Sequence, residues 1–278
     1  MSAKYQAYRN ICIFIALSVL FYLIGYWLIF RLQKATPLMM SVGFAAVVTC
    51  WICNIKLSDL GWKWFRHKEQ LLSYFIPLGV ISLAYGLIWV LGFGGFYDAG
   101  YAGELRETYS LGQWPDSALL GFHFFLTATI TFALTLPSVL GEEIAWRGLL
   151  VQQLSQIVSP QKTALISGAL WTCFHFPLIF LGLYGVEGTP LLYQLFCFSL
   201  YLMSASVIMT YLRLKTGGVW TAVIFHMSSN VFIQKFYAKV TLENDSTVWM
   251  GDEFGLIPGL LMFIVAVGFY RKLGSINT

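Results

Sequence analysis

The sequence carries very little charge. Only 11% of its 278 residues are Asp, Glu, Lys or Arg, while 58% are hydrophobic. Soluble domains carry roughly 25% charged residues, so this composition leaves little room for a separate soluble domain. The few basic residues are scattered along the chain and form no stripe, which argues against a nucleic-acid partner. We therefore expect an integral membrane protein whose main surroundings are membrane lipid.

Cysteine patterns and compact metal motifs are also missing. The five cysteines all lie inside or at the edge of apolar runs, which argues against a disulfide framework. The chain has only four histidines and no H-E-x-x-H sequence. A cleavable signal is not evident either, because the apolar run after Lys4 and Arg9 is too long for a signal-peptide core. We expect the first apolar run to remain as a membrane span.

Long apolar runs dominate the chain. Most are close to the roughly 20 residues that a helix needs to cross the hydrocarbon core, and they lack the alternation of a β-barrel strand. We predict an all-α fold, a polytopic bundle of about eight transmembrane helices. The predicted helices cover residues 10–30, 37–53, 71–93, 117–140, 163–183, 190–212, 219–235 and 255–270.

The predicted helices form a single integral membrane domain over residues 1–278. Residues 1–116 hold the first three helices and an outer loop at 94–116, and residues 117–240 hold helices four to seven. Residues 241–278 hold the last loop and the eighth helix. Helices four to seven contain nearly all of the polar residues placed inside apolar sequence.

The lysines and arginines predict the orientation. If both termini are cytoplasmic, twelve of the 17 basic residues lie on the cytoplasmic side, the asymmetry that the positive-inside rule expects. We predict cytoplasmic termini in a bacterial or archaeal inner membrane. The five basic residues on the outer side are Arg31, Lys34, Arg106, Lys235 and Lys239.

Two adjacent acids follow the fourth apolar run, in "GEEIAWRG" at 141–148. Glu143 and Arg147 are four residues apart, so they share a helix face and can pair. Glu142 points about 100° away and lacks that partner, which suits a general acid or base. The other interpretation is that the cluster marks the point where a helix leaves the bilayer. We expect Pro137 and Gly141 to loosen or end the helix at this depth.

Two histidines lie within apolar sequence on later helices. His175 ends "WTCFH", four residues after Trp171, and His226 begins "HMSSN", four residues before Asn230. Glu142 and His175 could deprotonate a water, with His226 and Asn230 donating to an oxyanion.

A catalytic zinc site is the open alternative, with Glu142, His175 and His226 as ligands. A third histidine, His123, lies about five helical turns before the two acids. It is expected to be a packing or interfacial residue.

These three segments resemble the EExxxR, FxxxH and HxxxN motifs of one membrane family, in the same order on successive helices. The family comprises the CAAX prenyl endopeptidases and the bacterial bacteriocin-processing and self-immunity proteins. The motifs cover roughly the second half of the chain. Trp171 stands where the family has phenylalanine, and the second motif has one histidine where the eukaryotic prenyl enzymes tend to have two.

The resemblance implies an intramembrane endopeptidase with a catalytic cavity that faces the cytoplasm. It implies that Glu142 is the catalytic glutamate, that His175 shares the water, and that His226 and Asn230 form the oxyanion site. Supporting roles are implied for Trp171 in shaping the pocket and for Glu143 and Arg147 in ordering the loop end of their helix. No cofactor is favoured, with zinc as the alternative.

The substrate implied is a peptide or protein near a membrane-anchored or prenylated segment. Two other functions are compatible with the sequence. One is a non-catalytic scaffold or bacteriocin-immunity protein of the same fold, and the other is a proton-coupled transporter, since Glu, His and Arg also build proton relays. Few spans look polar enough to require a protein partner, and the oligomeric state is left open.

Overall fold

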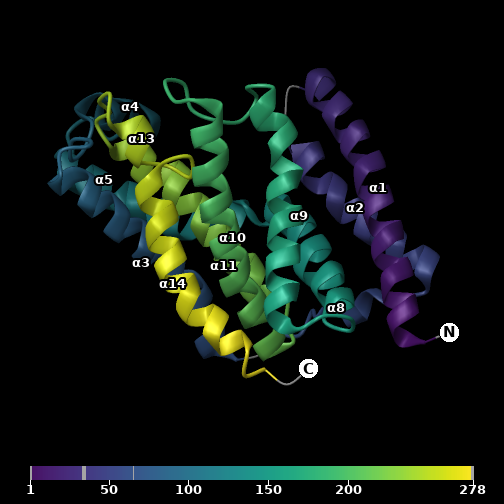
Figure 1. Ribbon diagram of the computed structural model, residues 1–278. Helices are drawn as coiled ribbons and strands as arrows, with labels where there is room; N and C mark the ends of the chain where they lie inside the picture. Colours follow the sequence, from purple (N-terminus) through teal and green to yellow (C-terminus); the bar gives the residue numbers. More distant parts are fainter. Residues whose placement is uncertain (1, 33–35, 65, 277–278) are drawn as a thin grey trace.

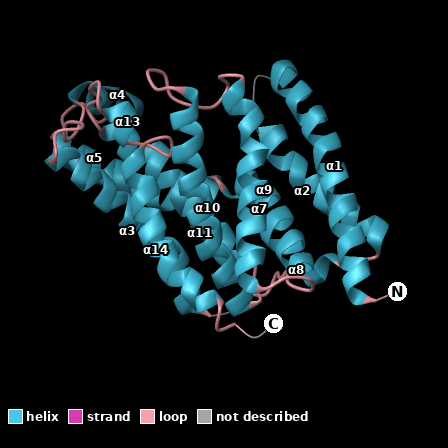
Figure 2. Ribbon diagram, in the orientation of Figure 1, coloured by secondary structure: helices cyan, strands magenta, loops and turns pink. Residues whose placement is uncertain are grey.

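The computed structural model describes residues 2–32, 36–64 and 66–276. Over these residues the chain is a helical bundle, and its one β-type contact is an isolated antiparallel bridge between Gly95 and Leu242 (Figures 1 and 2). Helix α10 (Leu191–Thr216) packs against both α9 (Pro160–Phe180) and α14 (Leu256–Leu273). The predicted all-helical membrane bundle is confirmed.

Each of the eight predicted spans corresponds to a helical stretch of the structure, with ends that differ by up to three residues where the helices stop short of the predicted bounds. Six helical stretches are long and apolar enough to cross a membrane: Ala3–Leu32, His67–Val90, Asp116–Leu134, Pro160–Phe180, Leu191–Thr216 and Leu256–Leu273. The second, α2 (Thr36–Cys53), is apolar but shorter over Pro37–Cys53. The seventh runs through α11 (Trp220–Asn230), the π-helix η4 (Val231–Tyr237) and α12 (Ala238–Val240). That all eight cross the bilayer stays a prediction.

The fourth span is interrupted at the irregular Thr135, just before Pro137, and then continues well past the two acids, so the helix is loosened here and does not end. It runs through α5 (Asp116–Leu126), η2 (Thr127–Thr131), α6 (Phe132–Leu134), α7 (Leu136–Glu143), η3 (Ile144–Leu150) and α8 (Val151–Leu154). Pro137 is tolerated because it lies in the first turn of α7, just after the irregular Thr135. The acids therefore lie buried inside the bundle and not at a helix end, while the point where this helix leaves the bilayer stays a prediction.

Gly141 has a packing role in this helix. A Cβ atom on Gly43 of α2 would lie 2.7 Å from both the Cα and the carbonyl oxygen of Gly141, and one on Gly141 would lie 3.2 Å from the Cα of Met40. Small residues at helix contacts allow the backbones to approach closely, and here they bring α2 against α7. This contact holds the acid-bearing helix from one side.

The outer loop predicted at 94–116 contains a helix of its own. Helix α4 (Ala99–Tyr109) begins at Asp98, whose side chain accepts a hydrogen bond from the backbone N–H of Gly100 at 2.7 Å. The hydroxyl groups of Tyr101 and Tyr109 lie 3.0 and 2.8 Å from the two ring nitrogens of His123. His123 is thus confirmed as a packing residue remote from the acids.

Both termini lie at one end of the bundle, together with α8, and the 181–190 loop lies at the other end (Figure 1). Arg147 is fully buried and Arg213 nearly so, which removes both from the set of cytoplasmic loop charges. Lys34 lies outside the described residues. Ten of the remaining fourteen basic residues still lie on the side of the termini, so the asymmetry persists.

The glycine contact leads to a stability prediction. We expect Gly43→Ala to lower the free energy of unfolding by about 1–3 kcal/mol, because the new methyl group must displace the backbone of α7. Gly79→Ala is the matched control, since its Cβ meets nothing within 4 Å on α3. Thermal unfolding of the two purified variants in detergent tests this, and equal stability would contradict the close contact.

Candidate active site

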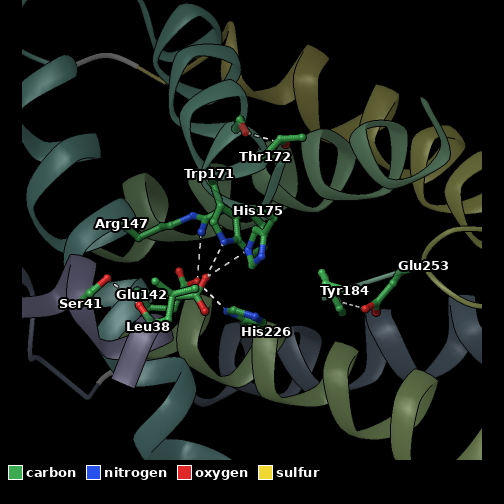
Figure 3. Close-up of polar contacts among 12 residues, drawn as sticks. Leu38, Ser41, Glu142, Arg147, Trp171, Thr172, His175, Tyr184, His226 and Glu253 are labelled. Carbon is green, nitrogen blue, oxygen red and sulfur yellow. Dashed lines mark hydrogen bonds and ion pairs between the residues drawn. The ribbon is translucent and has the colours of Figure 1, made fainter. Parts of the chain in front are cut away.

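The sequence-predicted residues converge on one pocket of about 220 Å³ inside the bundle. Its walls are formed by α7, α9, α10 and α11, and most of them are apolar or aromatic. Glu142, Trp171, His175, His226 and Asn230 all line it. Glu143 and Arg147 lie directly behind it, with side chains that are 0% exposed. Figure 3 shows the polar groups meeting from separate helices.

Glu142 is 4% exposed and has a specific set of neighbours. The indole Nε1–H of Trp171 donates to its Oε2 at 2.7 Å, and Nε2 of His175 lies 3.6 Å from the same oxygen (Figure 3). A separation of 3.6 Å is too long for a direct hydrogen bond, and one water shared by the two groups would satisfy both. Helices α7 and α9 thus place the Glu142 carboxylate and the His175 imidazole on either side of one small space in the pocket.

Glu143 makes a different set of contacts from those of Glu142. Its Oε1 accepts from Nη1 of Arg147 at 3.0 Å, as the four-residue spacing predicted, and from Nδ1 of His226 at 2.9 Å. The implied role of ordering the loop end of the helix does not fit, because the helix continues as η3. In the structure Glu143 and Arg147 orient His226 from behind the pocket.

Trp171 connects the two acids. The guanidinium carbon of Arg147 lies 4.1 Å from the centre of its ring, a cation–π geometry, while its N–H reaches Glu142. Its ring also meets the ring of His226 edge-on, with centroids 5.1 Å apart. A phenylalanine at this position would keep the ring contacts and lose the hydrogen bond.

Asn230 lies one helical turn after His226, at the end of α11, and lines the same pocket. The π-helix η4 begins at the next residue, as η3 begins directly after Glu143. Single π turns inside α-helices occur frequently at functional sites. The structure brings His226 and Asn230 together, and their oxyanion role stays a prediction.

Other polar residues of the pocket were not anticipated from the sequence. Tyr184, Gln234 and Glu253 line its far part, and Glu253 is 4% exposed. Glu253 lies at the edge of the last apolar run, the same signal that drew attention to Glu142. Because Glu253 also belongs to an acidic loop, it did not stand out as an isolated acid beside apolar sequence.

The pocket extends away from the termini. Leu183, Tyr184 and Glu253 belong to loops at the opposite end of the bundle, and all other lining residues lie within helices (Figure 1). His175 is five residues from the end of α9 but fifteen from its start. The pocket therefore reaches the loops at the end opposite the termini, while the side of the membrane that it faces stays a prediction.

The zinc alternative requires three ligands that converge on one point. No group of three His, Cys, Asp or Glu side chains within residues 2–32, 36–64 and 66–276 has that arrangement. His226 directs Nδ1 to Glu143, while Glu142 is held by the Trp171 indole. The three side chains do not converge on one point among the described residues, and the zinc alternative stays a prediction.

Two comparisons with known proteins agree with the motifs. Residues 122–232, which include all three motifs, match the Rce1-like family of type II CAAX prenyl endopeptidases. CAAX prenyl protease 2 of Methanococcus maripaludis is 30% identical over 177 residues, which cover 59% of this chain and 60% of that protein. The resemblance to this family is confirmed over the matched segment.

The indole hydrogen bond leads to a prediction about activity. We expect Trp171→Phe to lower kcat/KM about tenfold or more, because a hydrogen bond to a charged group is worth about 1.5–3 kcal/mol. Trp146→Phe is the matched control, because the buried N–H of Trp146 has no partner within the described residues. Steady-state kinetics on one peptide compares the two variants, and equal effects would show that Trp171 acts through its shape alone.

The buried ion pair between Glu143 and Arg147 leads to a prediction about stability. We expect Glu143→Gln or Arg147→Met alone to cost about 3–5 kcal/mol, since each leaves a buried charge without its partner. The double variant should be more stable than the sum of the single effects implies. Unfolding of the four proteins in a denaturing detergent measures the coupling. Additive effects would mean that the pair contributes no interaction of its own.

Proposed function

Because the motif-bearing segment is similar to the type II CAAX prenyl endopeptidases, we propose that this protein is an intramembrane endopeptidase. It hydrolyses a peptide bond near a membrane-anchored or prenylated segment of its substrate. The observation that carries the proposal is the position of Glu142 and His175, which flank one site in a buried pocket at 3.6 Å from each other. Trp171 donates a hydrogen bond to Glu142, and Arg147 lies against the ring of Trp171.

The proposed reaction begins with a water between Glu142 and His175. Glu142 accepts a proton from the water as its oxygen attacks the carbonyl carbon of the substrate. His226 and Asn230 donate to the oxyanion of the tetrahedral intermediate. Glu142 then transfers the proton to the leaving nitrogen, the C–N bond breaks, and a carboxylate and an amine are released.

The hydrogen bond of His226 bears on its part in this reaction. Its Nδ1–H donates to Glu143, so Nε2 is the ring atom that remains for the substrate. Nε2 donates a hydrogen bond only when the ring is positively charged, and the Glu143 carboxylate stabilises that charge. Arg147 fixes the position of Glu143 through its own hydrogen bond to Oε1. Glu143 and Arg147 are therefore proposed as positioning residues.

The proposed mechanism uses no metal. The position of Glu142 and His175 on either side of one site supports this choice, and no three metal-ligating side chains converge there among the described residues. The proposed substrate is a lipidated peptide or protein. The Methanococcus relative is named as a CAAX prenyl protease, which supports a prenylated substrate here. Apolar pocket walls such as Leu178, Phe198 and Leu202 are compatible with such a substrate.

The test is cleavage of farnesylated and unmodified peptides by the purified protein in lipid. We expect Glu142→Gln to lower kcat about 10²–10⁴-fold, the usual contribution of a general base. Glu107→Gln, an exposed glutamate on α4, is the matched control and should leave kcat unchanged. Activity should survive a strong chelator.

Other outcomes of the same assay would contradict parts of the proposal. Loss of activity on chelation, restored by zinc, would favour the metallopeptidase mechanism. A folded wild-type protein that cleaves neither kind of peptide would favour a non-catalytic scaffold. Preference for the unmodified peptides would remove prenylation from the substrate definition.

A further inference from the structure

The pocket contains a second carboxyl group that the proposed mechanism does not use. Glu253 lies in the turn between α13 (Thr247–Met250) and α14, outside the membrane-spanning helices. The hydroxyl of Tyr184 donates to its Oε1, and the amide of Gln234 donates to its two oxygens at 2.9 and 3.2 Å. Two residues from other segments, Tyr184 and Gln234, thus hold this acid at the pocket wall.

No positive charge accompanies this acid. Among the described residues, no Lys, Arg or His forms an ion pair with Glu253, and both of its side-chain partners are neutral. Burial raises its pKa to about 8. A buried carboxylate without a counter-charge is unfavourable, and a cationic ligand would relieve that cost. The neutral donors fix the position of the carboxyl group without supplying the missing charge.

Glu253 is close to the reaction site. Tyr184, whose hydroxyl holds Glu253, has its ring centroid 5.9 Å from that of His175 (Figure 3). Phe198 lies beside both rings, with centroids 5.4 and 5.6 Å away. The stem of a lysine or arginine side chain can lie along such aromatic rings while its charged end meets a carboxylate. The space between the two acids is therefore suited to a basic side chain.

We propose that Glu253, held by Tyr184 and Gln234, is a specificity-determining residue that binds a basic side chain of the peptide substrate close to the scissile bond. This inference rests on the proposed peptidase function. A Lys or Arg of the substrate places its charged group against the carboxylate of Glu253, with its methylene groups against Tyr184 and Phe198. The peptide bond is thereby positioned between Glu142 and the His226–Asn230 pair.

A structural role for the same cluster makes different predictions. Tyr184 and Glu253 come from two loops, so their hydrogen bond could simply hold the loops together. In that case Tyr184→Phe and Glu253→Gln would lower the melting temperature alike and weaken all peptides equally. A binding role requires that Glu253→Gln changes the preference for the charge of the peptide side chain. A hydrogen bond that only holds the two loops together would not affect that preference.

The experiment measures binding without turnover, in the Glu142→Gln background. Its probes are farnesylated peptides in which each position around the cysteine is in turn lysine, norleucine or glutamate. At one position we expect lysine to bind at least about tenfold more tightly than norleucine, and glutamate to bind most weakly. Adding Glu253→Gln should reduce the lysine-to-norleucine ratio to about one. The melting temperature of each variant shows that it is folded.

Several results would overturn the proposal. These are equal affinities for lysine and norleucine peptides, no measurable binding of any lysine peptide, or a lysine preference that survives Glu253→Gln. Cleavage of the same peptides by the wild-type protein separates this inference from the proposed function. Cleavage without a lysine preference would overturn the binding role alone, and a lysine preference in binding without any cleavage would overturn the peptidase alone.

Discussion

The structure of the site depends on one oxygen atom, Oε1 of Glu143, which accepts hydrogen bonds from Arg147 and His226. All three side chains are buried in an apolar bundle, where an ion without its partner is strongly unfavourable. The contact therefore ties the fourth helical stretch to α11 in one arrangement. Trp171 extends it, because its ring covers Arg147 and its N–H reaches Glu142.

Two neighbouring acids consequently have different environments although they are adjacent in the chain. Glu143 is closed off behind the pocket and is neutralised by Arg147, whereas Glu142 lines the pocket and has His175 across a 3.6 Å gap. A helix turns about 100° per residue, so adjacent side chains inevitably face different neighbours. One acid is thus available for structure and the other for chemistry.

The helix that carries these acids depends on local features that allow it to lie deep in the bundle. The close approach of Gly43 and Gly141 brings α2 against α7, and the π-helix η3 follows Glu143 without ending the helix. On the other side of the pocket, η4 follows Asn230. At the far end, Tyr184, Gln234 and Glu253 add a polar wall drawn from loops as well as helices. The rigid bundle therefore supplies the proposed chemistry, and the loops at this end supply the proposed selectivity.

The sequence by itself determined the helical membrane class, the approximate positions of eight helices, the Glu143–Arg147 pair and the three motifs. Hydropathy and the four-residue helical spacing are local properties of the chain, so they can be recognised without knowing which helices pack together in the fold. Only the tertiary structure decided that Glu143 holds His226, that Trp171 donates to Glu142, that Glu253 lines the pocket, and that the pocket extends away from the termini. These contacts join segments up to 83 residues apart, from Glu143 to His226. They depend on how helix surfaces fit together, which no local pattern in the sequence encodes.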